Sequence, residues 1–197
     1  MTFRRVAIIP ARGGSQRIPG KNKRAFHGKP IIYYAIKTAH ESGLFDKVVV
    51  STDDPEIAEI AMTNGAFAWH RYKAFCADEC GTQEVLAQCA AFFTKEDWIC
   101  GIYATTPLML ATDLQRAVRC LHDDPTKHYA MAVGTEPLRD AGQFYYGSAK
   151  TFIDRKPLLT AHTIMIPIQE KYVCDINTIE DFSKAEAMYA KLHQEKG

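Results

Sequence analysis

The sequence lacks the features by which membrane proteins, disulfide scaffolds and nucleic-acid-binding proteins are usually identified. No apolar run approaches the length of a transmembrane helix, and the first one is too short for a signal peptide. The six cysteines form no C-x-x-C pair, so we expect free thiols in a reducing compartment. A net charge of +1 argues against broad electrostatic binding to nucleic acid or to an anionic membrane. We therefore expect a cytoplasmic protein without nucleic-acid or membrane partners.

Internal repeats, low-complexity segments and linkers are also missing. A chain of 197 residues with 47% hydrophobic residues fits one ordinary domain, so we expect residues 1–197 to fold together. A zinc site is not indicated, because His70, Cys76 and Cys80 lack a fourth ligand.

Predicted strands and helices alternate along the chain. Buried-strand patterns cover 6–9, 48–50, 66–70, 98–103 and 129–133, with extended segments at 163–168 and 172–174. Helical patterns cover 30–43, 55–65, 82–93 and 112–122, and a last helix begins near 179. Thr82 is expected to cap its helix, and Thr112 with Gln115 matches a capping box. This alternation predicts an α/β fold, a three-layer α/β/α Rossmann-like arrangement with a mostly parallel sheet.

A loop rich in glycine and cations follows the first strand. Arg12, Arg17 and Lys21 supply charge, while Gly13 and Gly14 allow close backbone approach, a combination suited to triphosphate. The loop is not a Walker A motif, since five residues separate its last two glycines and Asn22 stands where Ser or Thr is required. A basic surface loop without a ligand is the alternative. Because ligands bind beyond the carboxyl ends of parallel strands, we expect a site at this edge.

Four later segments make the pattern more specific. They are Ser51-Thr52-Asp53-Asp54, residues 102–108, residues 140–145, and Asp175-Ile176-Asn177-Thr178 followed by Asp181. With the loop, they resemble the CMP-sialic acid synthetase (acylneuraminate cytidylyltransferase) family of sugar-activating enzymes. Within it, the likeness is greatest to the branch that acts on pseudaminic acid. The resemblance spans almost the whole chain in the right order.

The resemblance implies a nucleotidyltransferase fold and a CTP-dependent reaction. In the family, the anomeric hydroxyl of a nine-carbon keto-sugar acid attacks the α-phosphorus of CTP and yields CMP-sugar and pyrophosphate. Such a transfer needs aligned reactants, a divalent cation and donors on the departing pyrophosphate. The implied cofactor is Mg²⁺ or another divalent cation, the implied partners are CTP and a sugar acid, and the implied assembly is a homodimer.

The resemblance also assigns roles to individual residues. Catalytic roles fall to Arg12, Lys21 and Asp175, and metal binding to Asp175 and Asn177. Nucleotide binding falls to Ala11, Arg12, Gly13, Gly14, Ser15, Lys21, Asn22, Arg71 and Thr82. Sugar binding falls to Tyr103, Thr105, Asp140, Gln143 and Tyr145. Two alternatives stay open: Arg71 as a solvated arginine at a strand end, and residues 144–146 as an ordinary core strand.

Three departures from the family pattern bear on activity. Gln16 replaces a lysine that usually lies beside the phosphates, and Asn177 replaces the second aspartate of an Asp-Ile-Asp-Thr motif, which should lower metal affinity. Relatives also carry an inserted segment of a few dozen residues where this chain has only 135–138. Either the chain has lost that segment or the sequence omits it. We favour omission, because connections of that length are often mobile lids.

Two further hypotheses stay open on function. One is a cytidylyltransferase for another sugar acid, such as a sialic-like, legionaminic or octulosonic sugar. The other is a catalytically weak homologue that binds nucleotide without turnover, for which Gln16, Asn177 and the short junction are the evidence. No general base for the sugar hydroxyl is identified from the sequence.

Overall fold

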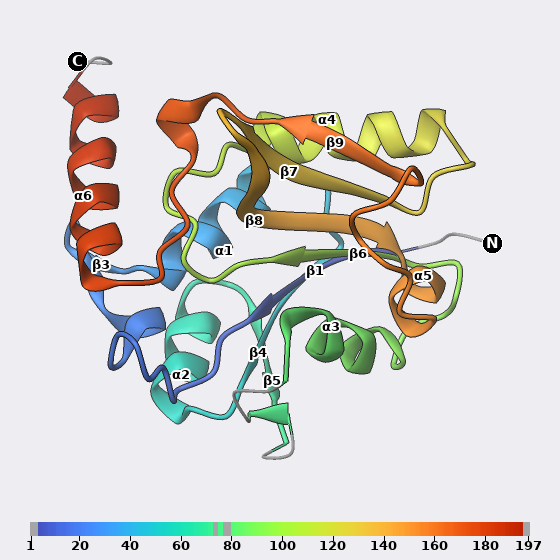
Figure 1. Cartoon of the computed structure of the whole chain (residues 1–197). Coiled ribbons are helices and arrows are strands. Elements are labelled where there is room, and N and C mark those ends of the chain that lie inside the picture. Colours follow the sequence, from blue (N-terminus) through green and yellow to red (C-terminus); the bar gives the residue numbers. More distant parts are fainter. Residues whose placement is uncertain (1–3, 73–74, 77–79, 195–197) are drawn as a thin grey trace.

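A seven-stranded sheet forms the centre of the protein, in a computed structural model that describes residues 4–72, 75–76 and 80–194 (Figure 1). The strands lie in the order β5 (Phe67–His70), β4 (Lys47–Thr52), β1 (Arg5–Pro10), β6 (Trp98–Ile102), β8 (Leu138–Ser148), β7 (Tyr129–Thr135) and β9 (Thr163–Pro167). All neighbouring pairs are parallel except those that β8 makes with β6 and β7. The prediction of a mostly parallel sheet is therefore confirmed.

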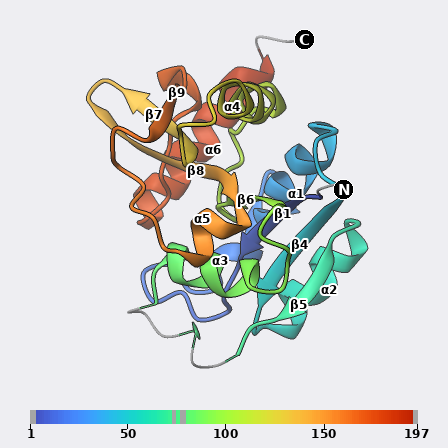
Figure 2. The same ribbon diagram turned by 90° about the vertical axis from the view of Figure 1, so that its right-hand side faces the viewer.

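Helices cover both faces of this sheet, as the three-layer prediction requires. The helices are α1 (Ile32–Glu41), α2 (Pro55–Thr63), α3 (Thr82–Ala90), α4 (Ala111–Asp123), α5 (Ala149–Ile153) and α6 (Ile179–Gln194). One core cluster joins α1, α2 and α4 to alternate strand residues such as Ala7 and Ile9, and the other joins α3 and α5 to Val6 and Ile8. Figure 2 shows α2 and α3 on opposite sides of β1 and β4. Period-two alternation along each strand thus supplies apolar side chains to both layers.

The C-terminal helix α6 lies beside the sheet and packs on the segment that follows the basic loop (Figure 1). Phe26, in the two-residue strand β2 (Ala25–Phe26) that pairs with β3 (Lys29–Pro30), is fully buried against Phe182 and Tyr189 of α6. These aromatic rings meet edge to face, the arrangement their quadrupoles favour. The segment that leads into α6 is thereby held close to the loop after β1, since Ile18 and Ile176 share one core cluster.

The structure corrects several expected details. Gly81, not Thr82, is the N-cap of α3, and Thr82 is its first helical residue. The capping box is absent because α4 begins at Ala111, and the Gln115 amide instead donates to the carbonyl of Ser42 at 2.9 Å. Residues 170–172 form a short 3₁₀ helix, η3 (Glu170–Tyr172), so the expected extended segment 172–174 does not begin at 172. A second short 3₁₀ helix, η1 (Lys21–Lys23), closes the basic loop.

The antiparallel direction of β8 and its extent over 138–148 go beyond what the sequence patterns predict. This strand contains residues 144–146, which are all buried, so the core-strand interpretation of these residues is right. Because β8 runs against its neighbours, its beginning lies at the same edge as the carboxyl ends of β1, β4, β5 and β6.

Among the described residues, none of the helices is long and apolar enough to span a bilayer.

Candidate functional site

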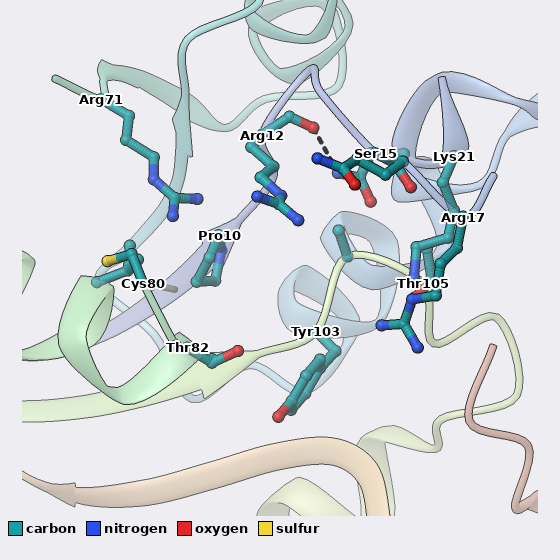
Figure 3. Close-up of a pocket in the computed structure, with 15 residues that line it drawn as sticks. Pro10, Arg12, Ser15, Arg17, Lys21, Arg71, Cys80, Thr82, Tyr103 and Thr105 are labelled. Atoms are coloured by element: carbon teal, nitrogen blue, oxygen red, sulfur yellow. Dashed lines mark hydrogen bonds between the residues drawn. The ribbon is translucent and has the colours of Figure 1, made fainter. Parts of the chain in front are cut away.

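An open cavity of about 520 Å³ lies at this edge of the sheet (Figure 3). Its walls come from the ends of β1 and β6, the basic loop, the start of α3 and the residue after β5. The lining residues are Pro10, Arg12, Ser15, Gln16, Arg17, Lys21, Asn22, Arg71, Cys80, Gly81, Thr82, Val85, Tyr103, Ala104 and Thr105. A volume of this size accommodates a nucleotide-sized ligand. The expected site at the carboxyl ends of the strands is therefore a real cavity.

The basic loop is held in place by its own backbone groups. The backbone N–H of Gly13 donates to Asp53 Oδ1 at 2.9 Å, and that of Ala11 donates to the carbonyl of Ser51 at 2.9 Å. The Asn22 side chain is buried and its amide donates to the carbonyl of Arg12 at 2.9 Å (Figure 3). The N–H of Ser15 donates to the carbonyl of Gly13 at 3.1 Å. These hydrogen bonds brace the loop at the edge of the cavity.

Arginine side chains approach the cavity from several directions. In Figure 3, Arg12 and Arg71 extend into it from one side and Arg17 from the other. Arg12 Nη1 donates to the carbonyl of Cys76 at 3.1 Å, and Arg71 donates to the carbonyl of Phe75. Arg71 is only 5% exposed, and its Nε has no hydrogen-bond partner in the described part of the chain, so the solvated alternative for Arg71 is wrong. Guanidinium groups gathered in this way form a site for a polyanion.

Lys21 connects the basic loop to the acidic segment near the C-terminus. Its Nζ donates to the carbonyl of Ile176 at 2.7 Å. Burial lowers the pKa of Lys21, Arg17 and Arg12 lower it further, and Asp175 opposes them. Burial and the neighbouring guanidinium charges disfavour the charged form of Lys21. A bound anion would therefore stabilise that charge.

Asp175 and Asn177 lie close to this lysine, outside the cavity lining. Asn177 Nδ2 donates to Asp175 Oδ2 at 2.6 Å, and a side chain at Gly142 would come within 3.1 Å of the Asp175 carboxyl group. Within the described residues, no group of three or more His, Cys, Asp or Glu side chains is arranged to hold a metal. One carboxylate and one amide oxygen are nevertheless a donor set that suits Mg²⁺, which is usually completed by water and substrate phosphates.

The expected sugar-binding residues fall into two groups. Tyr103 and Thr105 line the cavity. Gln143 is 3% exposed and its Nε2 donates to the carbonyl of Tyr172 at 2.8 Å, while Asp140 is exposed beyond the cavity lining. Tyr145 is buried below Tyr103, and the two hydroxyl groups lie 2.8 Å apart.

The sequence assignments and the cavity overlap substantially. Arg12, Ser15, Lys21, Asn22, Arg71, Thr82, Tyr103 and Thr105 line it, whereas Ala11, Gly13, Gly14, Asp140, Gln143, Tyr145, Asp175 and Asn177 do not. The structure adds Cys80 and Val85 to the lining, for which the sequence offers no signal beyond their closeness to Thr82. The other lining residues Pro10, Gln16 and Arg17 lie in the glycine-rich basic loop that the sequence already identifies.

Comparison with known proteins supports the resemblance found in the sequence. A family model described as cytidylyltransferase matches residues 6–170. Pseudaminic acid cytidylyltransferase from Campylobacter jejuni is 33% identical over 229 residues, with 98% of this chain and 99% of that protein covered. N-acylneuraminate cytidylyltransferase from Streptococcus agalactiae is 26% identical over 211 residues, covering 90% of this chain and 51% of that protein.

Solved structures share the fold at low sequence identity. CMP:2-keto-3-deoxy-manno-octonic acid synthetase complexed with CTP superposes with a TM-score of 0.77 at 17% identity, covering 95% of this chain and 99% of that one. The manganese complex of Rv0371C from Mycobacterium tuberculosis has a TM-score of 0.69 at 12% identity, covering 93% and 98%. The Rossmann-like nucleotidyltransferase architecture is thereby confirmed.

Proposed function

The chain belongs to the cytidylyltransferase family, and from this premise we propose that it transfers CMP from CTP to a nine-carbon keto-sugar acid, with pseudaminic acid favoured. The cavity that gathers Arg12, Arg17, Lys21 and Arg71 at the carboxyl ends of parallel strands carries this proposal. The whole-length similarity to the Campylobacter jejuni protein supports the sugar.

Arg12, Arg17 and Lys21 bind the triphosphate and stabilise the departing pyrophosphate. Attack on the α-phosphorus makes the β- and γ-phosphates a leaving group whose negative charge grows in the transition state. Donors that are already in place stabilise that charge without reorganisation. Arg71, buried and with its Nε unpartnered in the described part of the chain, approaches the same space from the β5 side. The cations are thus placed to favour P–O bond cleavage.

Asp175, with the side-chain oxygen of Asn177, is where a divalent cation would be held. When bound, that cation neutralises phosphate charge and orients the α-phosphate. The chain's own contribution is to place one carboxylate near Lys21, so cation and triphosphate would occupy neighbouring positions. With one carboxylate fewer than the Asp-Ile-Asp-Thr motif, the site should need more metal for half-saturation.

The sugar acid is proposed to lie beside Tyr103 and Thr105. Both side chains carry hydroxyl groups at the cavity wall, with Tyr103 across the cavity from Arg12 and Thr105 on the side of Arg17 (Figure 3). Gln143 and Asp140 do not line the cavity, so they would influence the sugar site indirectly. The side chain of Gln143 is already hydrogen-bonded to the carbonyl of Tyr172. An octulosonic or sialic-like sugar remains the second candidate, because N-acylneuraminate cytidylyltransferases and an octonic acid synthetase are among the similar proteins.

We propose that residues 1–197 act as one domain, in the cytoplasm and as a homodimer. In place of the inserted segment of relatives, Thr135 pairs directly with Leu138 across a two-residue turn. Glu170 binds this turn through the backbone N–H of Thr135 at 2.8 Å and through Arg139 at 2.7 Å. Glu170 thus fastens the short junction at residues 135–138 to the segment that follows β9.

The deciding experiment measures pyrophosphate release from CTP and Mg²⁺, with pseudaminic acid and N-acetylneuraminic acid tested in parallel. Release with pseudaminic acid alone is the expected result. Release with N-acetylneuraminic acid alone would transfer the proposal to a sialic-like substrate. Tight CTP binding without release from either sugar would overturn the enzymatic proposal and favour a nucleotide-binding homologue.

A further inference from the structure

Three side chains form a continuous line of hydroxyl and carboxyl groups between the cavity and solvent. Tyr103, which lines the cavity, has its hydroxyl oxygen 2.8 Å from that of Tyr145. The Tyr145 hydroxyl donates to Asp140 Oδ2, and Asp140 is exposed. Figure 3 places the Tyr103 ring at the base of the cavity with its hydroxyl group pointing away from Arg12. The line thus runs from the cavity wall through the buried interior of β8 to the surface.

The donors along this line can be assigned from valence alone. The Tyr145 hydroxyl donates to Asp140 Oδ2 and thereby uses its single proton. The Tyr145 oxygen must then accept from Tyr103, which uses the only proton of Tyr103. The remaining lone pair of Tyr103 can therefore only accept a hydrogen bond. Thr82, at the same cavity wall, has its hydroxyl within reach of that lone pair.

Both tyrosines keep their protons under ordinary conditions. Burial raises the pKa of Tyr145, and it also raises the pKa of Tyr103. Each hydroxyl can therefore pass one proton on only as it receives another. Asp140 is fixed at its other oxygen, since Oδ1 accepts from the backbone N–H of Gly142 at 2.8 Å. The direction of the chain, from the cavity toward Asp140, is thus built into the fold.

We propose that Tyr103, Tyr145 and Asp140 form a directed relay that removes the proton of the attacking sugar hydroxyl. This proposal rests on the proposed function. Tyr103 is the catalytic residue because it would touch the reacting hydroxyl, whereas Tyr145 and Asp140 act through it. A carboxylate that takes up a substrate hydroxyl proton during phosphoryl transfer is an established arrangement in kinases. Here the carboxylate would be reached through two phenols.

The transfer balances without a further reactant. The anomeric oxygen forms a bond to the α-phosphorus, and the bond from the α-phosphorus to the bridging oxygen of pyrophosphate breaks. The hydroxyl proton passes to the Tyr103 oxygen, the Tyr103 proton to the Tyr145 oxygen, and the Tyr145 proton to Asp140. Because Asp140 is exposed, it returns its proton to water, and rotation of the two hydroxyl groups restores the starting direction.

Tyr145→Phe tests the relay, with Tyr146→Phe as the matched control. Both tyrosines are buried neighbours on β8, but the Tyr146 hydroxyl lies 3.1 Å from His122 Nε2 in the other core cluster. With CTP, Mg²⁺ and pseudaminic acid, we expect Tyr145→Phe to lower kcat by about 10²-fold, a typical acid–base contribution. KM for CTP should not change, and Tyr146→Phe should keep the wild-type kcat. The kinetic isotope effect of D₂O on wild-type kcat should disappear in Tyr145→Phe.

Asp140→Asn and Asp140→Glu complete the test. The asparagine keeps an oxygen for the N–H of Gly142 but cannot take a proton, so its kcat should fall like that of Tyr145→Phe, and Asp140→Glu should restore part of it. An active wild type whose kcat is unchanged by Tyr145→Phe, or reduced equally by Tyr146→Phe, overturns the relay and leaves the proposed function intact. A wild type that binds CTP but releases no pyrophosphate overturns both. Circular dichroism of each variant identifies one that has not folded, in which case Asp140→Asn, at an exposed residue, gives the decision.

Discussion

The ammonium group of Lys21 donates to the carbonyl oxygen of Ile176 at 2.7 Å, across 155 residues of sequence. This hydrogen bond joins the basic loop after β1 to the segment that carries Asp175 and Asn177. The loop supplies cations for phosphate, and the segment supplies the oxygens proposed for the metal. Anion and cation sites are thereby held in contact before any ligand arrives, which reduces the ordering that binding requires.

Lys21→Met is expected to weaken triphosphate binding and turnover. The methionine keeps most of the side-chain volume but removes a charge-assisted hydrogen bond, so kcat/KM for CTP should fall roughly ten- to a hundredfold. Pyrophosphate release at varied CTP measures the loss. Lys29→Met removes the same charge from an exposed position in β3 and serves as the control. Equal activity of the two variants would show that Lys21 is only a bracing residue.

Asn177→Asp is expected to raise affinity for the divalent cation. A second carboxylate beside Asp175 adds charge to the proposed metal site. The Mg²⁺ concentration for half-maximal pyrophosphate release should therefore fall, whereas Asp175→Asn should raise it. Without metal, Asn177→Asp places two anions where the amide now donates at 2.6 Å, so Tm should drop and recover as Mg²⁺ is added. An unchanged Mg²⁺ requirement would remove residue 177 from the metal site.

Local patterns predict most of the fold because each pattern depends on neighbouring residues. Periodicity and Pro55 identify α2, and the side chain of Asp54 confirms its start by accepting from the N–H groups of Glu56 and Ile57. The direction of β8 cannot be read this way, because parallel and antiparallel strands alternate inward and outward alike. The capping box of Thr112 and Gln115 fails because the Gln115 amide reaches across to Ser42, a contact outside its own helix.

The sequence also predicts a good part of the residues that line the cavity. Loop chemistry and strand ends bring Arg12 and Lys21 to one cavity without any knowledge of packing, and the family resemblance adds Tyr103. The position of Tyr145 next to Tyr103 depends instead on the register between β6 and β8. Ile102 pairs with Phe144, and this pairing brings the two tyrosine hydroxyl groups together. Register between distant strands has no local signal, so the hydroxyl chain to Asp140 becomes visible only in three dimensions.

Glu170 is expected to stabilise the β7–β8 turn at neutral pH and to lose that contribution in acid. Its bond to Arg139, with a further one from the backbone of Thr135, lowers the pKa of Glu170 from 4.5 to about 2. A carboxyl group with a lowered pKa adds stability that is complete above pH 4.5 and is lost as the pH falls toward about 2. The difference in unfolding free energy between wild type and Glu170→Gln should shrink over this interval in urea titrations. Glu59→Gln, at an exposed position of α2, is the control for removing a carboxylate, and a wild type–Glu170→Gln difference that stays constant down to pH 2 would contradict the role of the ion pair.

Gly13→Ala should damage the loop, and Gly14→Ala should not. A methyl group at Gly13 would lie 2.8 Å from both Cβ and Oδ2 of Asp54, whereas nothing lies within 4 Å of one at Gly14. Asp54 caps α2 and binds Lys23 at 2.9 Å, so it cannot yield without losing those contacts. Overpacking of this kind costs about 1–3 kcal/mol. Urea unfolding and CTP titration of both variants should show Gly13→Ala less stable and weaker in binding, because Arg12 moves with its neighbour. Equal stability of the two variants would mean that Asp54 can move away at no cost, and that the glycine at position 13 is not required by packing.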